Sequence, residues 1–132
     1  MANTFYPKGK TKILTAKIDL AGDTIKAALL KNTYNYSAAH EFLSDLGASV
    51  IDAQELTGKS VVDGVFDAAD VTFPTLVAGN TARAIVLFKD TGVPGTSALI
   101  GYIDDVPGLP ANTSGGDIKT TWSNGADKVL AI

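Results

Sequence analysis

The sequence predicts a mainly β protein: a β-sandwich or small barrel of about seven or eight short strands, with one short helix and an extended N-terminal arm. Three observations lead to this fold class. The 132 residues include 13 glycines, spread along the chain, and tight turns between short strands favour glycine. Threonine, valine and isoleucine, which favour strands, also occur throughout. With 45% apolar and 19% charged residues, the chain can bury a core, and its length is typical of one domain.

The chain opens with a segment that predicts no core element. Residues 1–10 are polar and include Pro7 and Gly9, a composition that favours an extended arm. We therefore expect two parts, the arm over 1–10 and a single β-rich domain over 11–132. An arm of this kind could be removed without unfolding the domain. The residues that follow it, 11–18, are ambiguous between a short helix and a strand.

One strand and one helix come next. Residues 24–31 have the composition of a strand. Ser37 is a good N-cap for a helix over 37–46, and Glu41 stands one residue beyond the usual capping-box position. Gly47 is placed to end this helix. Because the helix is so short, tertiary packing must stabilise it.

From residue 49 onward the pattern is that of strands separated by turns. Residues 84–88 are continuously apolar, which is typical of a central strand covered on both faces. Residues 123–126, with Asn-Gly at their centre, predict a hairpin turn. Residues 105–116 are rich in proline and glycine and predict one long surface loop. The expected strands are 49–56, 60–67, 70–76, 82–89, 97–104, 117–122 and 127–132.

Charge is unevenly distributed along the chain. Residues 1–31 hold six lysines and two aspartates, a net charge of +4, whereas the remainder carries −7 and the whole chain −3. A basic leading segment on an acidic body can steer an oriented encounter with an acidic partner. Solvated faces that keep the protein soluble are the alternative explanation. We expect no nucleic-acid partner, because the acidic body would repel phosphates and aromatic residues are not interleaved with the lysines.

Composition also argues against several other classes of protein. There is no cysteine, so disulfides and thiolate metal sites are unavailable. No apolar run reaches the roughly 18 residues that a membrane-spanning helix needs, and the N-terminus lacks the apolar stretch of a secretory signal. We therefore expect no membrane partner, and a location in a reducing cytoplasm or in an assembly built there.

Two patterns resemble catalytic or ligand-binding motifs, and each lacks a required part. Residues 57–60 (Thr-Gly-Lys-Ser) resemble the end of a phosphate-binding loop, but Ala53 stands where the motif needs its first glycine. A turn between strands is the expected structure there. His40 is the only histidine, which excludes multi-histidine zinc sites and weakens any triad. We expect it to be a partly exposed helix residue.

Carboxylates form the remaining candidate for chemistry. Asp63, Asp67 and Asp70 fall around a strand connection and could bind a hard cation, although they lack the spacing of a calcium loop. Aspartates in turns or on solvated faces are the commoner arrangement. We expect no enzymatic activity, no metal and no cofactor.

The candidate contact residues lie in the two segments that the pattern leaves outside the core. Tyr6, in the polar arm, could anchor onto a partner, with packing back onto its own domain as the equal alternative. The basic charge of the arm and the Pro/Gly-rich loop make both segments candidate partner-binding surfaces. The candidate residues are Phe5, Tyr6, Pro7, Lys8 and Lys10 in the arm, and Pro107, Leu109 and Pro110 in the loop.

Several segments, in order and spread over nearly the whole chain, are similar to segments of a family of small structural proteins of tailed-bacteriophage virions. The resemblance implies assembly in the host cytoplasm, a final location in the virion, and binding to the major capsid protein or another virion protein. It implies no active-site residue. The segments are 1–10, 23–26, 38–45, 67–74, 88–94, 115–118 and 122–126.

Within a virion, the favoured role is a head decoration (cement) protein that clamps neighbouring capsid subunits from outside. Such proteins are often trimers, so the resemblance implies a homo-oligomer. Two alternatives stay open. A tail or head–tail connector accessory protein would form a ring and would need exposed strand edges or loops. A carbohydrate- or cation-binding module on the virion surface would use the aspartates and the few aromatic residues.

Overall fold

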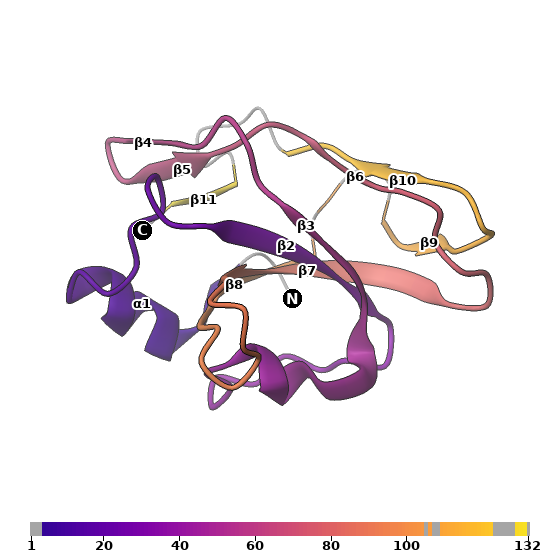
Figure 1. Ribbon diagram of the computed structural model, residues 1–132, viewed down its shortest axis with the longest axis horizontal. Coiled ribbons are helices and arrows are strands. Elements are labelled where there is room, and N and C mark those ends of the chain that lie inside the picture. Colours follow the sequence, from indigo (N-terminus) through magenta and orange to yellow (C-terminus); the bar gives the residue numbers. More distant parts are fainter. Residues whose placement is uncertain (1–3, 105, 107–108, 123–128, 132) are drawn as a thin grey trace.

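A six-stranded antiparallel sheet is the largest element of the protein. The computed structural model describes residues 4–104, 106, 109–122 and 129–131. The strand order is β1-β8-β7-β2-β3, and β9 pairs with the start of β7 (Figure 1). The strands of this sheet are β1 (Thr4–Phe5), β2 (Ile25–Lys31), β3 (Val50–Glu55), β7 (Thr81–Lys89), β8 (Leu99–Ile103) and β9 (Ala111–Asn112).

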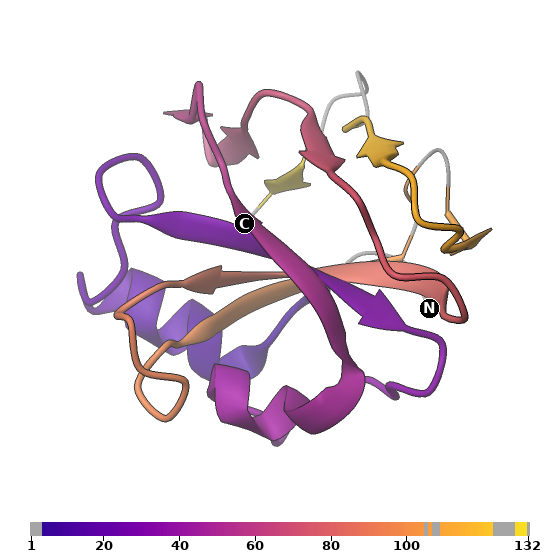
Figure 2. The same cartoon turned by 45° about the vertical axis from the view of Figure 1, so that its right-hand side comes forward.

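A second layer of short strands covers one face of this sheet. One pair joins β6 (Val71–Phe73) to β10 (Ile118–Thr120), and β5 (Val65–Asp67) lies between β4 (Ser60–Val62) and β11 (Leu130–Ala131). Figures 1 and 2 show these strands on one side of the large sheet, with α1 (Pro7–Leu14) and the 3-10 helix η1 (Leu43–Ser49) on the other. The predicted mainly β fold class is confirmed, in a sandwich-like form.

Apolar side chains fill both sides of the large sheet. Toward the second layer, Leu29 and Leu87 pack in one cluster with Phe66 and Phe73. On the opposite face, alternate residues of the same strands form a second cluster. Five of its buried members are Ala28, Val86 and Phe88 from the sheet, and Tyr6 and Leu46 from the segments that cover it. The prediction that residues 84–88 form a central strand covered on both faces is confirmed.

The extended arm expected over residues 1–10 is wrong for residues 4–10. β1 lies at the edge of the sheet, and the backbone N–H of Tyr6 donates to the carbonyl of Ile100 at 2.9 Å. Helix α1 then begins at Pro7, whose fixed φ suits a first helical turn. A side chain on Gly9 would clash with the backbone of Leu99 and Ile100, so α1 packs closely on β8.

A boundary at residue 10 therefore falls inside a helix of the domain. The polar composition of the segment was misleading because its hydrogen-bond and packing partners come from β8, about ninety residues further along the chain. The same helix decides the ambiguity of residues 11–18: the helical alternative holds for residues 11–14.

The helix predicted over residues 37–46 is also corrected. The structure has a 3-10 helix over Leu43–Ser49 instead, and Gly47, at φ 57°, forms a kink within it. The difference is caused by tertiary contacts with residues 97 and 98. Leu43 donates its N–H to Ser97, and Phe42 forms an isolated bridge with Ala98, which holds the chain extended where an α-helix would continue. Such contacts override the weak propensity of a short helix.

Most other strand predictions are confirmed within a few residues, with two differences. The predicted strand 60–67 is a hairpin, in which Asp63 and Gly64 adopt φ of 52° and 77° and join β4 to β5. The predicted loop 105–116 contains the short strand β9. The hairpin expected at 123–126 lies outside the described residues, as do residues 127, 128 and 132 of the strand expected over 127–132. Within that expected strand, Leu130–Ala131 form β11.

Candidate functional site

Helix α1 presents one face to the domain and another to solvent. Gly9 is buried and Ile13 packs against the core, whereas Lys10 and Leu14, one helical turn apart, are exposed. Leu14 is 75% exposed, and among the large apolar residues in the described part of the chain only Val77 is more exposed. The outward face of α1 therefore combines a positive charge with an uncovered apolar side chain.

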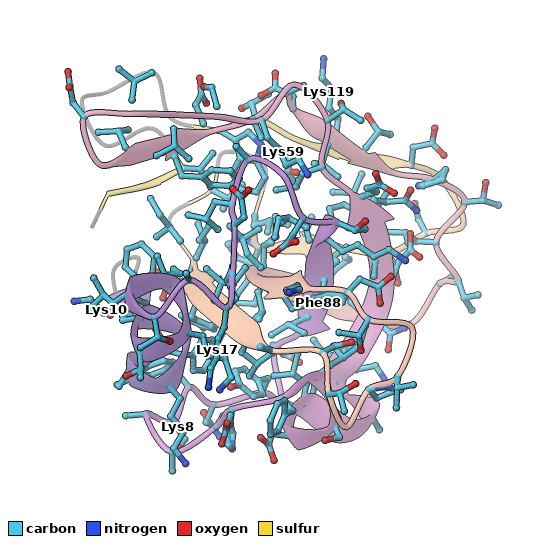
Figure 3. The ribbon with its side chains drawn as sticks, turned by 60° about the vertical axis from the view of Figure 1, so that its left-hand side comes forward. Lys8, Lys10, Lys17, Lys59, Phe88 and Lys119 are labelled. Atoms are coloured by element: carbon cyan, nitrogen blue, oxygen red, sulfur yellow. The ribbon has the colours of Figure 1, made fainter. Side chains whose placement is uncertain are left out.

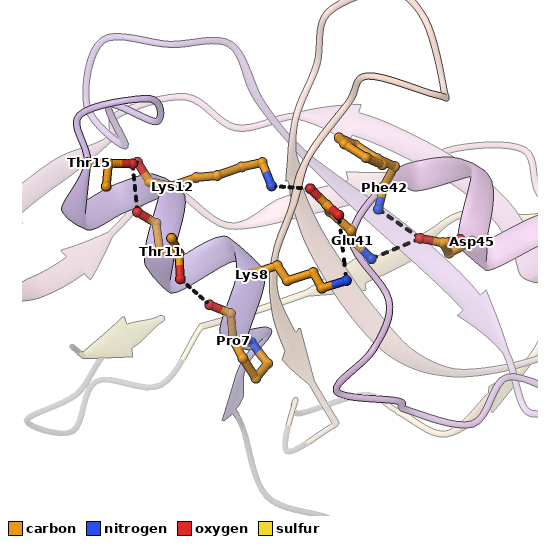
Figure 4. A network of polar contacts seen from close by, with 8 residues as sticks. All are labelled: Pro7, Lys8, Thr11, Lys12, Thr15, Glu41, Phe42 and Asp45. Carbon is orange, nitrogen blue, oxygen red and sulfur yellow. Dashed lines mark hydrogen bonds and ion pairs between the residues drawn. The ribbon is translucent and has the colours of Figure 1, made fainter.

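Glu41 fixes α1 to the rest of the domain from the side. Its carboxylate accepts a hydrogen bond from Lys12 at 2.6 Å and lies 3.7 Å from the ammonium of Lys8 (Figure 4). The carboxylate of Asp45 in turn accepts the backbone N–H groups of Glu41 at 2.8 Å and Phe42 at 2.9 Å. These bonds hold the segment before η1 against α1, and so they fix the position of the helix on the domain.

The charges of this clamp shift the pKa values of its carboxyl groups. The hydrogen bond from Lys12 is the main cause that holds the pKa of Glu41 below its ordinary value of 4.5. The backbone N–H groups of Phe42 and Glu41 hold the pKa of Asp45 below its ordinary value of 3.8. Both carboxylates are therefore ionised at neutral pH, where they pair with the donors around them.

Glu41→Gln tests this clamp through its pH dependence. Because the folded-state pKa of Glu41 is lowered, its ionised form stabilises the fold above the unfolded pKa, and that contribution is lost as the pH falls through the folded pKa. We expect the variant to melt below the wild type at about pH 7, and by a smaller margin at about pH 3. Glu55→Gln, at an exposed position in β3, is the matched control in thermal melts. A deficit of equal size at both pH values would contradict the clamp.

Two exposed lysines, Lys10 on α1 and Lys17 in the turn after it, have no acidic partner among the described residues. Lys10 lies 5.9 Å from the ring centre of Phe5, and no ion pair joins it or Lys17 to the described part of the chain. The carbonyl of Lys17 accepts a hydrogen bond from Lys89 at 2.9 Å, which holds the turn after α1 in place. Figure 3 shows Lys10 and Lys17 on the side of α1, away from Lys119 of the second layer.

We call Lys10, Leu14 and Lys17 the basic helical surface. Its two positive charges can attract carboxylates, and Leu14 can lose exposed apolar area when a partner covers it. Its backbone is fixed before any partner binds, so little ordering of main chain would oppose association.

The structure separates the candidate contact residues that the sequence grouped. Pro7, Lys8 and Lys10 are exposed on or beside α1, but Phe5 and Tyr6 are buried in the core. Tyr6 therefore packs on its own domain and offers no anchor to a partner. In the predicted loop, Leu109 packs against the core and Pro110 is exposed. Pro107 lies outside the described residues.

Tyr6 belongs to a cluster of tyrosines that sequence reasoning did not group. The hydroxyl of Tyr34 lies 2.7 Å from the hydroxyl of Tyr6 and 2.7 Å from Nδ1 of His40. Burial raises the pKa of both Tyr6 and Tyr34, so both phenols are neutral. His40 is partly exposed as expected, although it lies in a turn region outside any helix. The rings of Tyr36 and Tyr102 complete the cluster, 5.6 Å apart.

The other motif-like patterns have ordinary structural roles. Residues 57–59 lie in the connection between β3 and β4, with Gly58 at φ 60°, and Ser60 begins β4. The side chain of Lys59 donates to the carbonyl of Asp23. Asp67 and Asp70 accept backbone N–H groups from Ala68 and Trp122. Over the described ranges, no three histidine or carboxylate side chains gather where they could hold a metal ion.

Sequence reasoning missed two members of the basic helical surface, Leu14 and Lys17. The position of Leu14 beside Lys10 follows from their spacing of one helical turn, and a helical reading of residues 11–14 would have predicted it. Lys17 lies beyond the end of α1, so helical spacing does not predict its place. The described part of the chain contains no helix with the length and apolar character needed to span a bilayer. No protein-family model and no curated protein matches the chain.

Proposed function

We propose that the chain is a structural protein of a tailed-phage virion that decorates the head by binding major capsid subunits. The observation that supports this role best is the basic helical surface: Lys10 and the exposed Leu14 on α1, with Lys17 in the turn that follows, on a helix that the Glu41 clamp holds against the domain. Such a surface suits an acidic and partly apolar patch on a partner protein. The resemblance of seven sequence segments to phage virion proteins supports a partner within the virion. We favour the major capsid protein as that partner, and a homo-oligomer, with a trimer favoured.

The proposed activity is binding, with no catalytic step. Lys8 and Lys12 serve the Glu41 clamp, and Lys10, Leu14 and Lys17 remain for the partner. Phe5 and Tyr6, which the sequence suggested as contacts, are buried, so we propose these exposed residues as contacts in their place. Pro110 is exposed, so we retain it as a secondary contact with the partner.

A tail or head–tail connector component is the second candidate. The observation that favours it is the edge strand β4, whose residues Val61 and Val62 are 46% and 65% exposed. Among the described strands, β4 pairs only with β5 and leaves its other edge open. An open edge with exposed valines is the kind of surface through which copies of a protein mate in a ring.

Copy number in purified virions separates the two candidates. A decoration protein follows the icosahedral lattice of the head, so we expect on the order of hundreds of copies per virion, as set by repeated capsid sites. The measurement is quantitative gel densitometry or mass spectrometry against the major capsid protein. A stoichiometry of about one or two dozen copies, as for a single ring, would favour the tail candidate and reject head decoration.

A further inference from the structure

Strand β7 contains an irregularity at Arg83. Its pairing with β2 matches Leu30 with Ala84 and Lys31 with Ala82, so Arg83 is an extra residue without a partner in β2. The shift also changes which face the neighbours occupy: Ala82 packs in the cluster between the layers, and Ala84 packs in the cluster on the opposite face. Bulges of this kind often redirect a side chain toward a functional site.

The bulge directs Arg83 into the tyrosine cluster. Its Nη2 donates to the carbonyl of Tyr34 at 2.9 Å and to the hydroxyl of Tyr102 at 3.2 Å. Tyr36 is fixed as well, because its hydroxyl donates to the carbonyl of Phe5 at 3.2 Å and its ring lies 5.0 Å from that of Tyr6. The guanidinium and the phenol rings are therefore held in position before any ligand arrives, which lowers the entropic cost of binding.

These groups line a pocket of about 460 Å³, within the range of roughly 300–1,000 Å³ typical of small-molecule sites. Its lining contains one cation, one carboxylate, an amide and two phenols, so both hydrogen-bond donors and acceptors are present and the formal charges cancel. The lining residues are Asn35, Tyr36, Arg83, Tyr102, Asp104 and Pro110.

We propose that this pocket binds a neutral saccharide. A pyranose ring has an apolar C–H face, which can pack on the half-buried ring of Tyr36. It also has a rim of hydroxyl groups that both donate and accept, which suits the amide of Asn35, the guanidinium of Arg83 and the carboxylate of Asp104. The carboxylate makes a free anion a poorer ligand, since it offsets the charge of Arg83. The site shares no residue with the basic helical surface, and the proposal does not depend on the role in the capsid.

Titration of the purified protein with single saccharides tests the proposal. The probes are glucose, galactose, mannose and N-acetylglucosamine, with glucuronate and acetate as anions, followed by backbone amide NMR. We expect at least one neutral sugar to bind with a Kd of about 1–10 mM and to shift the amide signals of Asn35, Tyr36 and Arg83.

Asn35→Ala removes an exposed amide from the pocket without touching the core. We expect its affinity for that sugar to fall about five- to tenfold, the loss of one or two hydrogen bonds. Asn32→Ala, at an exposed position outside this pocket, is the matched control and should bind like the wild type. The proposal is overturned if no neutral sugar shifts these signals, if an anion binds more tightly than every neutral sugar, or if both variants bind equally well.

Discussion

Tyr6→Ala is expected to destabilise the protein by about 3–5 kcal/mol, the usual cost of removing a large aromatic side chain from a core. Tyr6 is fully buried, at 0% exposure, and packs in the cluster between the large sheet and the segments that cover it. For a domain whose total stability is typically about 5–15 kcal/mol, this is a large fraction. Denaturant unfolding followed by the fluorescence of Trp122 measures the loss.

Tyr6→Phe is the matched control for the same position. It keeps the ring and removes only the hydroxyl, while the Tyr34 hydroxyl retains His40 as a hydrogen-bond partner. Its cost should be about 1 kcal/mol, the net value of one hydrogen bond. If alanine were tolerated as well as phenylalanine, Tyr6 would not be part of the core and the segment would be an arm after all.

Deletion of residues 2–10 should likewise unfold the domain, contrary to what an extended arm implies.

Reversing the charge of the basic helical surface is expected to have the largest effect on binding. In Lys10→Glu/Lys17→Glu, two attractive contacts with an acidic capsid patch become repulsive. Like charges placed together at an interface cost several kcal/mol, so we expect capsid affinity to fall at least about tenfold. Stability should change little, because both side chains are exposed and make no ion pair with the described residues. Co-sedimentation with undecorated capsids, over a range of protein concentrations, measures the change.

Lys119→Glu is the control for non-specific electrostatics. Lys119 is exposed on β10 in the second layer, away from α1 (Figure 3). This variant should bind capsids like the wild type. Added salt should narrow the difference between the double variant and the wild type, because exposed charges are screened. If Lys119→Glu weakened binding as much as a single Lys10→Glu change, the basic helical surface would not be the contact.

Strands with strong local patterns could be predicted from the sequence. The continuous apolar run 84–88 required burial on both faces, and β7 lies between β8 and β2 with both faces covered. A further signal was present but overlooked: Asp63-Gly64 between valines is a two-residue hairpin turn.

Elements that depend on distant partners could not be predicted. Most residues of the segment around Tyr6 are polar, and the burial of Tyr6 depends on contacts with β8 and the tyrosine cluster. The 3-10 helix η1 replaced the expected α-helix because Ser97 and Ala98 hold the preceding residues extended. In both cases long-range contacts outweighed local propensity.

The candidate site could be predicted only in part, because some of its features are local in sequence and others depend on long-range contacts. The uneven charge identified Lys8 and Lys10, since a count of charged residues needs no structure. Lys8 nevertheless belongs to the Glu41 clamp, because a partner twenty-nine or more residues away in sequence closes on α1. The role of Arg83 could not be foreseen, since it arises from the register between β2 and β7.

Site-specific photo-crosslinking in assembled virions identifies the protein that the basic helical surface contacts. A photoreactive residue in place of Lys10 reports which protein lies against the basic helical surface, and the same residue in place of Lys119 provides the comparison. If the basic helical surface binds the capsid, we expect crosslinks from position 10 to the major capsid protein, and few or none from position 119. Crosslinks from position 10 to a tail or connector protein, or equal crosslinking from the two positions, would contradict it.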